Sequence, residues 1–228
     1  MQASTLSGTS ALDHLLTVVD SEQGELYVDG LGRLVFRERY YRNENQQTAL
    51  ATFGDSGSEL RYSDLLLSHD AANVYNDVRA TRVSGTQQQA TDTTSIASYG
   101  RRVLSKSGLL VTTDAIALNV ATHLLGLNHD VETRIQSITF RSITDATTWL
   151  QLLRRTFGDR ITIKRRPPGG GTAISKDVFI ESVTHSVDRH AATWTTTWQL
   201  SPADQQGFWI LEHATLSRLG VTTRLQYQ

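Results

Sequence analysis

The chain has 228 residues, 39% hydrophobic and 20% charged, which suits a globular protein of one large or two small domains. Its net charge of −1 argues against a non-specific binder of nucleic acid or membranes, because such proteins carry a basic excess. The sequence contains no cysteine, which excludes disulfides and thiolate metal sites, and no apolar run approaches the roughly eighteen residues that span a bilayer.

The first expected element is an amphipathic helix over residues 11–21. Ser10 is a good N-cap, and Asp13 follows three residues later as in a capping box. Apolar residues recur at helical spacing, namely Leu12, Leu15, Leu16 and Val19. Residues 25–41 then form two β-rich runs around Asp29-Gly30-Leu31-Gly32. An Asp-Gly pair between apolar runs predicts a hairpin, because the turn needs positive φ.

The middle of the chain alternates strands and helices. Strands are expected over residues 76–84 and 101–111, and a helical turn is expected between Asp92 and Gly100. A second helix is expected to begin at Thr113. Its apolar face is predicted to contain Ile116, Val120, Leu124 and Leu127.

Residues 131–143 predict another strand. Apolar residues on one strand face recur every second position, but Ile135 and Ile138 are three positions apart, which indicates a β-bulge at Gln136-Ser137. Thr144 is expected to cap a third helix. The residues predicted to face inward from this helix are Ala146, Trp149, Leu150 and Leu153.

The clearest β signal lies in residues 158–203. In residues 193–203 the sequence TWTTTWQLSPA places Trp194, Thr196, Trp198 and Leu200 on one face and Thr195, Thr197 and Gln199 on the other. A period of two is typical of a half-buried antiparallel strand. Residues 167–171 (PPGGG) cannot continue a strand, and they predict a long hairpin loop.

Together these elements predict an α+β fold that is dominated by strands, with helices packed against a mostly antiparallel sheet or split barrel. The loop-rich region around residues 54–75 is the expected domain boundary. We expect a small helix–hairpin subdomain over residues 1–64 and a β-barrel domain with inserted helices over residues 74–228.

The sequence gives only weak signals for catalytic or metal-binding residues. The pairs His185/His190 and His123/His129 each need further ligands to hold zinc, and a helical pair usually has i, i+4 spacing. Ordinary strand and loop histidines are the stronger reading. Glycosidases use two carboxyl groups about 5–9 Å apart, and the sequence alone does not show which acids lie at such a distance. The candidates are Asp20, Glu22, Glu25, Asp29, Glu181 and Asp188. We therefore expect no catalytic, cofactor-binding or metal residues, and no enzyme activity.

The Gly169-Gly170-Gly171 run is expected to be a hairpin tip. A phosphate loop would require a following Gly-Lys-Ser/Thr that leads into a helix, and here the chain leads toward a strand. The adjacent Arg165 and Arg166 could meet acidic groups of a partner, although such pairs are usually solvated.

Aromatic pairs motivate an alternative function. Trp194/Trp198 and Tyr40/Tyr41 are candidates for a sugar-stacking platform. Because the two tryptophans share a face with Leu200, core packing is the stronger reading. Packing is also expected for Phe208 and Trp209.

The order of several segments resembles the minor tail proteins of long-tailed phages, particularly actinobacteriophages, and more distantly the central hub of contractile-tail baseplates. The segments that carry this resemblance are residues 10–36, 74–85, 95–125, 158–203 and 216–227. Residues 141–157 are only loosely similar. Members of this family are generally longer, with a further N-terminal barrel domain, so the chain is expected to correspond to a C-terminal portion of a larger tail polypeptide.

The resemblance implies a structural virion protein with a tail-tube-like split barrel and no cofactor. Its implied partners are other copies of itself in a homotrimer, the tail tube, and distal tail and tip or fibre proteins. Genomic DNA would contact it only in transit, and no membrane insertion is implied. The protein would assemble in the bacterial host cytoplasm and reside in the virion tail. Two rival functions are a receptor- or carbohydrate-binding module of the tail tip and a virion-associated cell-wall hydrolase.

Overall fold

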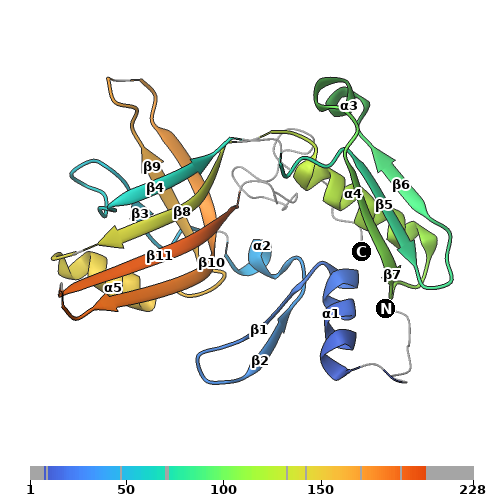
Figure 1. Ribbon diagram of the computed structural model, residues 1–228, viewed down its shortest axis with the longest axis horizontal. Helices are drawn as coiled ribbons and strands as arrows, with labels where there is room; N and C mark the ends of the chain where they lie inside the picture. Colours follow the sequence, from blue (N-terminus) through green and yellow to red (C-terminus); the bar gives the residue numbers. More distant parts are fainter. Residues whose placement is uncertain are drawn as a thin grey trace. The chain divides into compact units, whose positions relative to one another are not determined.

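The computed structural model describes residues 8, 10–46, 48–69, 72–131, 133–141, 143–169, 171–190 and 192–203. It has an α+β fold dominated by strands (Figure 1), which confirms the expected fold class. Residues 216–227, Phe208 and Trp209, for which we made predictions, lie outside the described residues.

The chain divides into two compact units. Unit 1 contains Met1–Tyr41 and Asp70–Glu132, and unit 2 contains Arg42–His69 and Thr133–Gln228. This grouping differs from a division into residues 1–64 and 74–228. The reason is that residues 42–69 supply two strands, β3 (Thr52–Phe53) and β4 (Asp64–Ser68), to the sheet that the C-terminal strands form.

Unit 1 begins with the expected helix and hairpin. Helix α1 (Ala11–Glu22) is capped by Ser10, whose Oγ accepts a hydrogen bond from the Asp13 N–H at 3.1 Å. Strands β1 (Glu25–Val28) and β2 (Leu34–Arg37) pair antiparallel. The Asp29 carboxylate shapes the turn because its Oδ1 accepts from the Leu31 and Arg33 N–H groups, each at 2.9 Å.

The rest of unit 1 is a three-stranded sheet with a helix on one face. The strand order is β6 (Gln88–Thr91), β5 (Asp77–Arg82) and β7 (Val103–Leu109). The expected turn between Asp92 and Gly100 is α3 (Thr93–Tyr99), and the helix expected at Thr113 is α4 (Asp114–Asn128). The core between α4 and the sheet contains Val78, Ala80, Leu109, Val111, Ala117, Val120, Ala121 and Leu124. Ile116, expected in that core, is 37% exposed.

Unit 2 is built on a six-stranded sheet. Its order is β3, β9 (Arg160–Arg165), β10 (Ile174–Asp188), β11 (Thr193–Pro202), β8 (Arg134–Arg141) and β4. All pairs are antiparallel except β3 with β9. The expected bulge is confirmed, because Leu66 pairs with Ser137 and Leu67 with Ile135, which leaves Gln136 as the extra residue.

Aromatic rings form the centre of the unit 2 core. Phe53, Phe140 and Trp198 are at most 1% exposed, and their ring centroids lie 4.9–5.4 Å apart in edge-on contacts. Edge-on geometry is a favourable arrangement for aromatic pairs. Ile138, Ile161, Ile163, Val178 and Ile180 surround these rings. The cluster fixes which face of the sheet is buried.

Helix α5 (Ala146–Arg154) covers this core, and Trp149 packs against it as expected, but the rest of the buried face differs from the expected one. Thr148 and Leu152 are each 2% exposed, whereas Leu150 is 44% and Leu153 is 62% exposed. Apolar residues surround much of this short helix, so their spacing left its phase ambiguous. The N-cap is Asp145 rather than Thr144, and its Oδ2 accepts from both the N–H and the hydroxyl of Thr148, which lets a polar side chain be buried.

Candidate assembly surface

On β8, β11 and the second half of β10, the face of the six-stranded sheet opposite the aromatic core carries mostly hydroxyl and amide side chains. On β9 and the first half of β10, the same face carries the Arg160–Asp177 ion pair. We call the first of these regions the hydroxyl face, and it comprises Ser182, Thr184 and Ser186 of β10, Thr195, Thr197 and Gln199 of β11, and Ser137, Thr139 and Arg141 of β8. Strand alternation puts these residues on one side, because Trp198 and Thr196 between them are buried. The Oγ1 atoms of Thr139 and Thr197 lie 3.3 Å apart across β8 and β11. Arg141 is the one charged member of this set.

A β-bulge in β10 positions an ion pair beside this face. The register shifts between Ile180 and Ser182, so Glu181 is the extra residue. Arg42 of the short helix α2 (Tyr41–Asn45) donates to both carboxylate oxygens of Glu181, with Nη1–Oε1 at 2.5 Å and Nη2–Oε2 at 2.9 Å. Ser201 Oγ also donates to Oε1.

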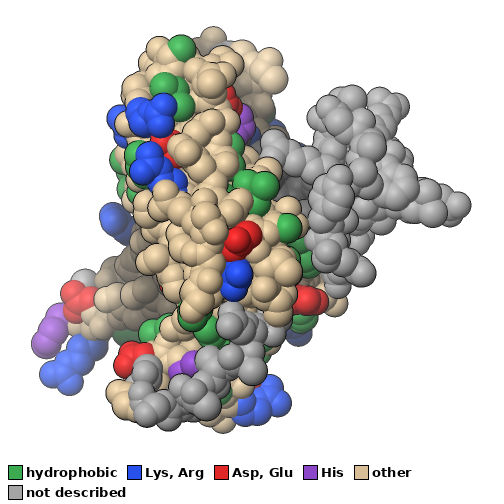
Figure 2. Space-filling model, turned by 90° about the vertical axis from the view of Figure 1, so that its right-hand side faces the viewer, with side chains coloured by type: hydrophobic (Ala, Val, Ile, Leu, Met, Phe, Trp, Pro, Cys, Tyr) green, Lys and Arg blue, Asp and Glu red, His purple; other side chains and the backbone are tan. Residues whose placement is uncertain are grey.

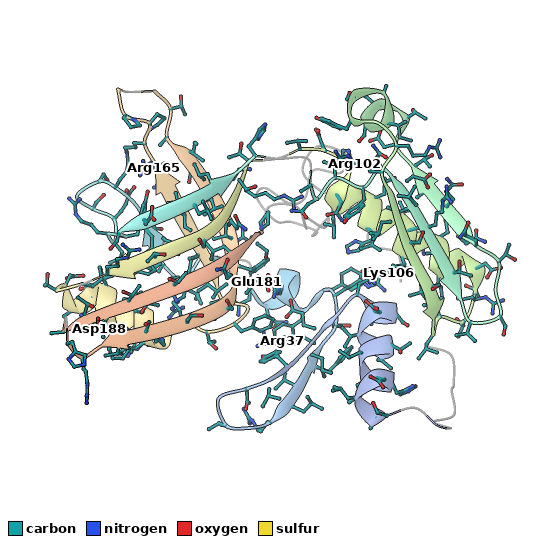
Figure 3. All side chains as sticks on the ribbon, in the orientation of Figure 1. Arg37, Arg102, Lys106, Arg165, Glu181 and Asp188 are labelled. Atoms are coloured by element: carbon teal, nitrogen blue, oxygen red, sulfur yellow. The ribbon has the colours of Figure 1, made fainter. Side chains whose placement is uncertain are left out.

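The environment of Glu181 favours its charged form. Burial acts to raise the pKa of Glu181, but the hydrogen bonds and charge of Arg42 outweigh burial and lower the pKa below its ordinary value. The Arg42 guanidinium also lies 4.9 Å from the ring centroid of Phe179. Figure 3 labels Glu181 on the β10 strand. Arg42 thereby ties α2 to the bulge.

Two strand segments of the sheet have an open edge. Strand β4 pairs with β8 on one side, and the other side has no strand among the described residues. Leu66 and Leu67 on β4 are 53% and 38% exposed. Strand β9 pairs with β10 over Ile174–Phe179, so within the described part of the chain Ser182–Asp188 pairs with β11 alone. Unpaired edges carry hydrogen-bonding groups that can accept another strand.

The glycine-rich loop between β9 and β10 is anchored at its base by acids of the same chain. Arg166 Nη1 lies 2.7 Å from Asp55 Oδ1, and both its Nη atoms contact Glu59, at 2.8 and 2.9 Å. These bonds lower the pKa of Glu59 to about 2 and raise that of Arg166. Arg166 therefore meets acids within its own unit. Figure 3 shows Arg165 and Asp188 at opposite ends of the β9–β10 ribbon.

The histidines named from the sequence make separate contacts. His185 Nδ1 lies 2.9 Å from Thr196 Oγ1, and His190 is exposed in the β10–β11 turn. In unit 1, His129 Nδ1 lies 3.1 Å from Asp92 Oδ2. Within the described part of the chain, no group of three or more His, Cys, Asp or Glu residues is arranged to hold a metal ion.

The acids considered for hydrolysis are mostly tied to cations. Lys106 contacts Asp20 at 2.8 Å, and Arg33 contacts Asp29 at 2.7 Å. Arg39 lies 3.6 Å from Glu22. Together with the Arg42–Glu181 pair, these contacts place each of the four acids beside a cation.

The aromatic pairs do not form stacking platforms of two exposed rings. Trp198 is fully buried. Trp194 is half-buried between Trp149, at 5.2 Å, and His185, at 5.5 Å. Tyr40 and Tyr41 are half-buried as well, with the guanidiniums of Arg39 and Arg37 at 5.5 and 4.4 Å from their respective ring centroids.

Exposed apolar side chains occur in small groups in both units. On the face seen in Figure 2, hydrophobic side chains are separated by polar atoms. The larger exposed ones on α1 and the β1–β2 hairpin are Leu12, Leu16, Val28, Leu31, Leu34 and Phe36. Among the described residues, each helix is too short or too polar to cross a membrane.

The solved structures that match this fold include two tail proteins. The tail protein from Neisseria meningitidis MC58 aligns with 87% of this chain at 15% identity and a TM-score of 0.59. The 43 kDa tail protein of prophage MuSo2 from Shewanella oneidensis aligns with 89% of this chain at 13% identity and a TM-score of 0.58. This chain shares its fold with both tail proteins.

The alignments span only 56% and 58% of those two chains. No protein-family profile matches the sequence. No curated protein matches it either.

Proposed function

We propose that the chain is a structural protein of the phage tail tip, a minor tail or hub protein that joins the tail tube to distal tip proteins. The shared fold with two tail proteins supports a place in the tail. The observation that carries the proposal is a sheet with one apolar face closed by α5, an opposite hydroxyl face, and two open edges.

In this proposal, copies of the chain associate as a homotrimer through the open edges. Rotation about a ring axis preserves strand direction, so β4 of one copy would meet Ser182–Asp188 of the next in antiparallel orientation. The side chains match: Leu65 and Leu67 continue the apolar face of Val183 and Val187, and Leu66 joins the hydroxyl face. Such head-to-tail contacts form a closed trimer when neighbouring copies are related by a rotation of one third of a turn.

The hydroxyl face would line the channel through which DNA leaves. Each phosphate contact made by a cation adds affinity that must be lost again as DNA moves. A surface of Ser, Thr and Gln side chains, on which Arg141 and Asp64 carry opposite charges, would let DNA pass with little retention. DNA is then a transient partner, and the protein acts without catalysis.

The alternative is a receptor- or carbohydrate-binding module of the tail tip. Of its two tryptophans it would use Trp194, because Trp198 is buried; Tyr40 and Tyr41 are half-buried. A glycan-array screen with the wild-type chain and Trp194→Ala tests it, and binding that the substitution abolishes would support this alternative over the structural role.

Light scattering of the purified chain, together with imaging of virions that carry a labelled copy, tests the proposed function. We expect an oligomer of three chains and a label at the distal end of the tail. A stable monomer with no affinity for tail proteins contradicts the proposal.

A further inference from the structure

A buried carboxylate in unit 1 holds two arginines in place. Asp77, at the start of β5, is fully buried. Its Oδ1 accepts from Arg79 Nε at 3.2 Å and Gln89 Nε2 at 2.8 Å. Its Oδ2 accepts from Arg79 Nη2 at 3.1 Å and Arg101 Nη1 at 2.6 Å. These four bonds use the hydrogen-bonding capacity of the carboxylate.

The arginines retain donors that Asp77 cannot use. A guanidinium has five N–H groups in a planar fork. Nη1 of Arg79 and both Nε and Nη2 of Arg101 have no acceptor among the described residues. Their side chains are 35% and 56% exposed. The two guanidiniums carry a charge of +2 and the Asp77 carboxylate carries −1. The cluster therefore has a net charge of +1 at the surface.

The cluster lies on the open face of the three-stranded sheet. Strand alternation puts Asp77 and Arg79 opposite Val78 and Ala80, which pack against α4. The neighbours on that open face are exposed: Gln89, Thr91, Val103, Ser105 and Ser107. The face is therefore flat and polar, with donors at its centre.

The charge of unit 1 favours a single carboxylate over a polyanion. With twelve acidic and eight basic residues, unit 1 has a net charge of −4. Such a field repels nucleic acid, whose binding requires many phosphate contacts. One acidic side chain on a protein surface needs only the local pair. Because the guanidiniums are already fixed, binding loses little further side-chain entropy.

We propose that Arg79 and Arg101 form a docking site for a glutamate or aspartate side chain of a neighbouring protein. The carboxylate would accept hydrogen bonds from the outward N–H groups of both arginines, and Asp77 would keep the two forks aligned. This inference rests on unit 1 alone and does not depend on the proposed place in the tail.

The test is a titration of the isotope-labelled full chain with acetylated, amidated glutamate, which carries a single carboxylate, at low ionic strength. Side-chain N–H resonances of Arg79 and Arg101 should shift and saturate. Arg101→Gln should weaken binding by about fivefold, the scale of one exposed ion pair. Arg101→Lys keeps the charge but loses the planar fork, so it should weaken binding by a smaller factor. Arg189→Gln, which removes an exposed arginine of unit 2, should leave binding unchanged.

Two results overturn the proposal. One is a shift of the same size and midpoint in Arg101→Gln as in the wild type. The other is a response of these resonances to inorganic phosphate but not to the capped glutamate. If Arg101→Gln does not fold, the wild-type titration and Arg101→Lys decide the question. Failure of this binding test would not count against the proposed trimer, which forms through the open edges of unit 2.

Discussion

Arg42 and Glu181 are 139 positions apart in the sequence, yet they form a two-point ion pair at the β10 bulge. Their side chains are 8% and 32% exposed, so solvent screens the pair only partly. Glu181 is the extra residue of the bulge, and Arg42 reaches it from α2. This pair links the start of the unit 2 sequence to its central strands.

Removal of Arg42 should destabilise unit 2. Arg42→Leu leaves Glu181 partly buried without its cation, and we expect a loss of about 2–3 kcal/mol in the free energy of unfolding. The double variant Arg42→Leu/Glu181→Leu should recover part of that loss, because no charge is left unpaired. Urea unfolding followed by circular dichroism measures both. Arg154→Leu, at an exposed position, serves as the control and should change stability by less than about 0.5 kcal/mol.

The contribution of this pair to stability should depend on pH. Because the folded state lowers the pKa of Glu181, the contribution is complete above the ordinary pKa of glutamate and is lost as pH falls through the folded value. The stability difference between wild type and Glu181→Gln should therefore shrink in acid. A difference that grows as pH falls would show that Arg42 does not stabilise the carboxylate.

Helix α5 offers a direct test of which face is buried. Leu152→Ala should cost about 2–5 kcal/mol because it opens a cavity beside the aromatic core. Leu153→Ala, one residue later and largely exposed, should change stability by less than about 0.5 kcal/mol. Thermal or urea unfolding distinguishes them. A larger loss in Leu153→Ala than in Leu152→Ala would support the helix phase expected from the sequence.

Trp198 should tolerate phenylalanine better than alanine. Its Nε1 atom is buried and has no hydrogen-bond partner among the described residues, so Trp198→Phe removes an unsatisfied donor along with ring volume. Trp198→Ala should cost about 3–5 kcal/mol, and Trp198→Phe clearly less. A loss in Trp198→Phe as large as that in Trp198→Ala would contradict this expectation.

Arg166 should control the titration of Glu59. The hydrogen bonds from Arg166 lower the pKa of Glu59 to about 2, so its carboxyl resonance should titrate near that pH. Arg166→Gln should raise the pKa toward the ordinary value. Carboxyl-carbon NMR follows both titrations, and Arg165→Gln is the adjacent control that should leave Glu59 unchanged. An unchanged pKa in Arg166→Gln would mean that the contact does not persist in solution.

The sequence predicted elements whose signals are local. Ser10, Asp92 and the Asp29 turn each act within a few residues, and each lies where its pattern indicates. The bulge at Gln136 was also visible, because a slip in alternation is a local event. The α+β class follows from the sum of these signals.

The features missed from the sequence depend on distant residues. Strands β4 and β6 are short, and β6 is polar, so each becomes a strand mainly because a partner strand lies beside it. The Arg42–Glu181 pair could not be predicted, because no local sequence pattern around either residue indicates a distant partner. The open edges are likewise a property of the strand order, which alternation along one strand cannot reveal.

Disulfide cross-linking between copies tests the central claim most directly. The chain has no cysteine, so Leu66→Cys on β4 with Thr184→Cys on β10 introduces a single pair. Two strands separate β4 from β10, so the pair is about 14 Å apart within one chain, beyond the reach of about 7 Å of a disulfide. Leu66→Cys with Gln199→Cys is the control, because Gln199 lies on an interior strand of the same face.

If the open edges of neighbouring copies pair, oxidation of the Leu66→Cys/Thr184→Cys protein should give covalent species that end at three linked chains, and the control should give far fewer. Oxidised protein that runs as a single chain, with its circular dichroism unchanged, would contradict assembly through these edges.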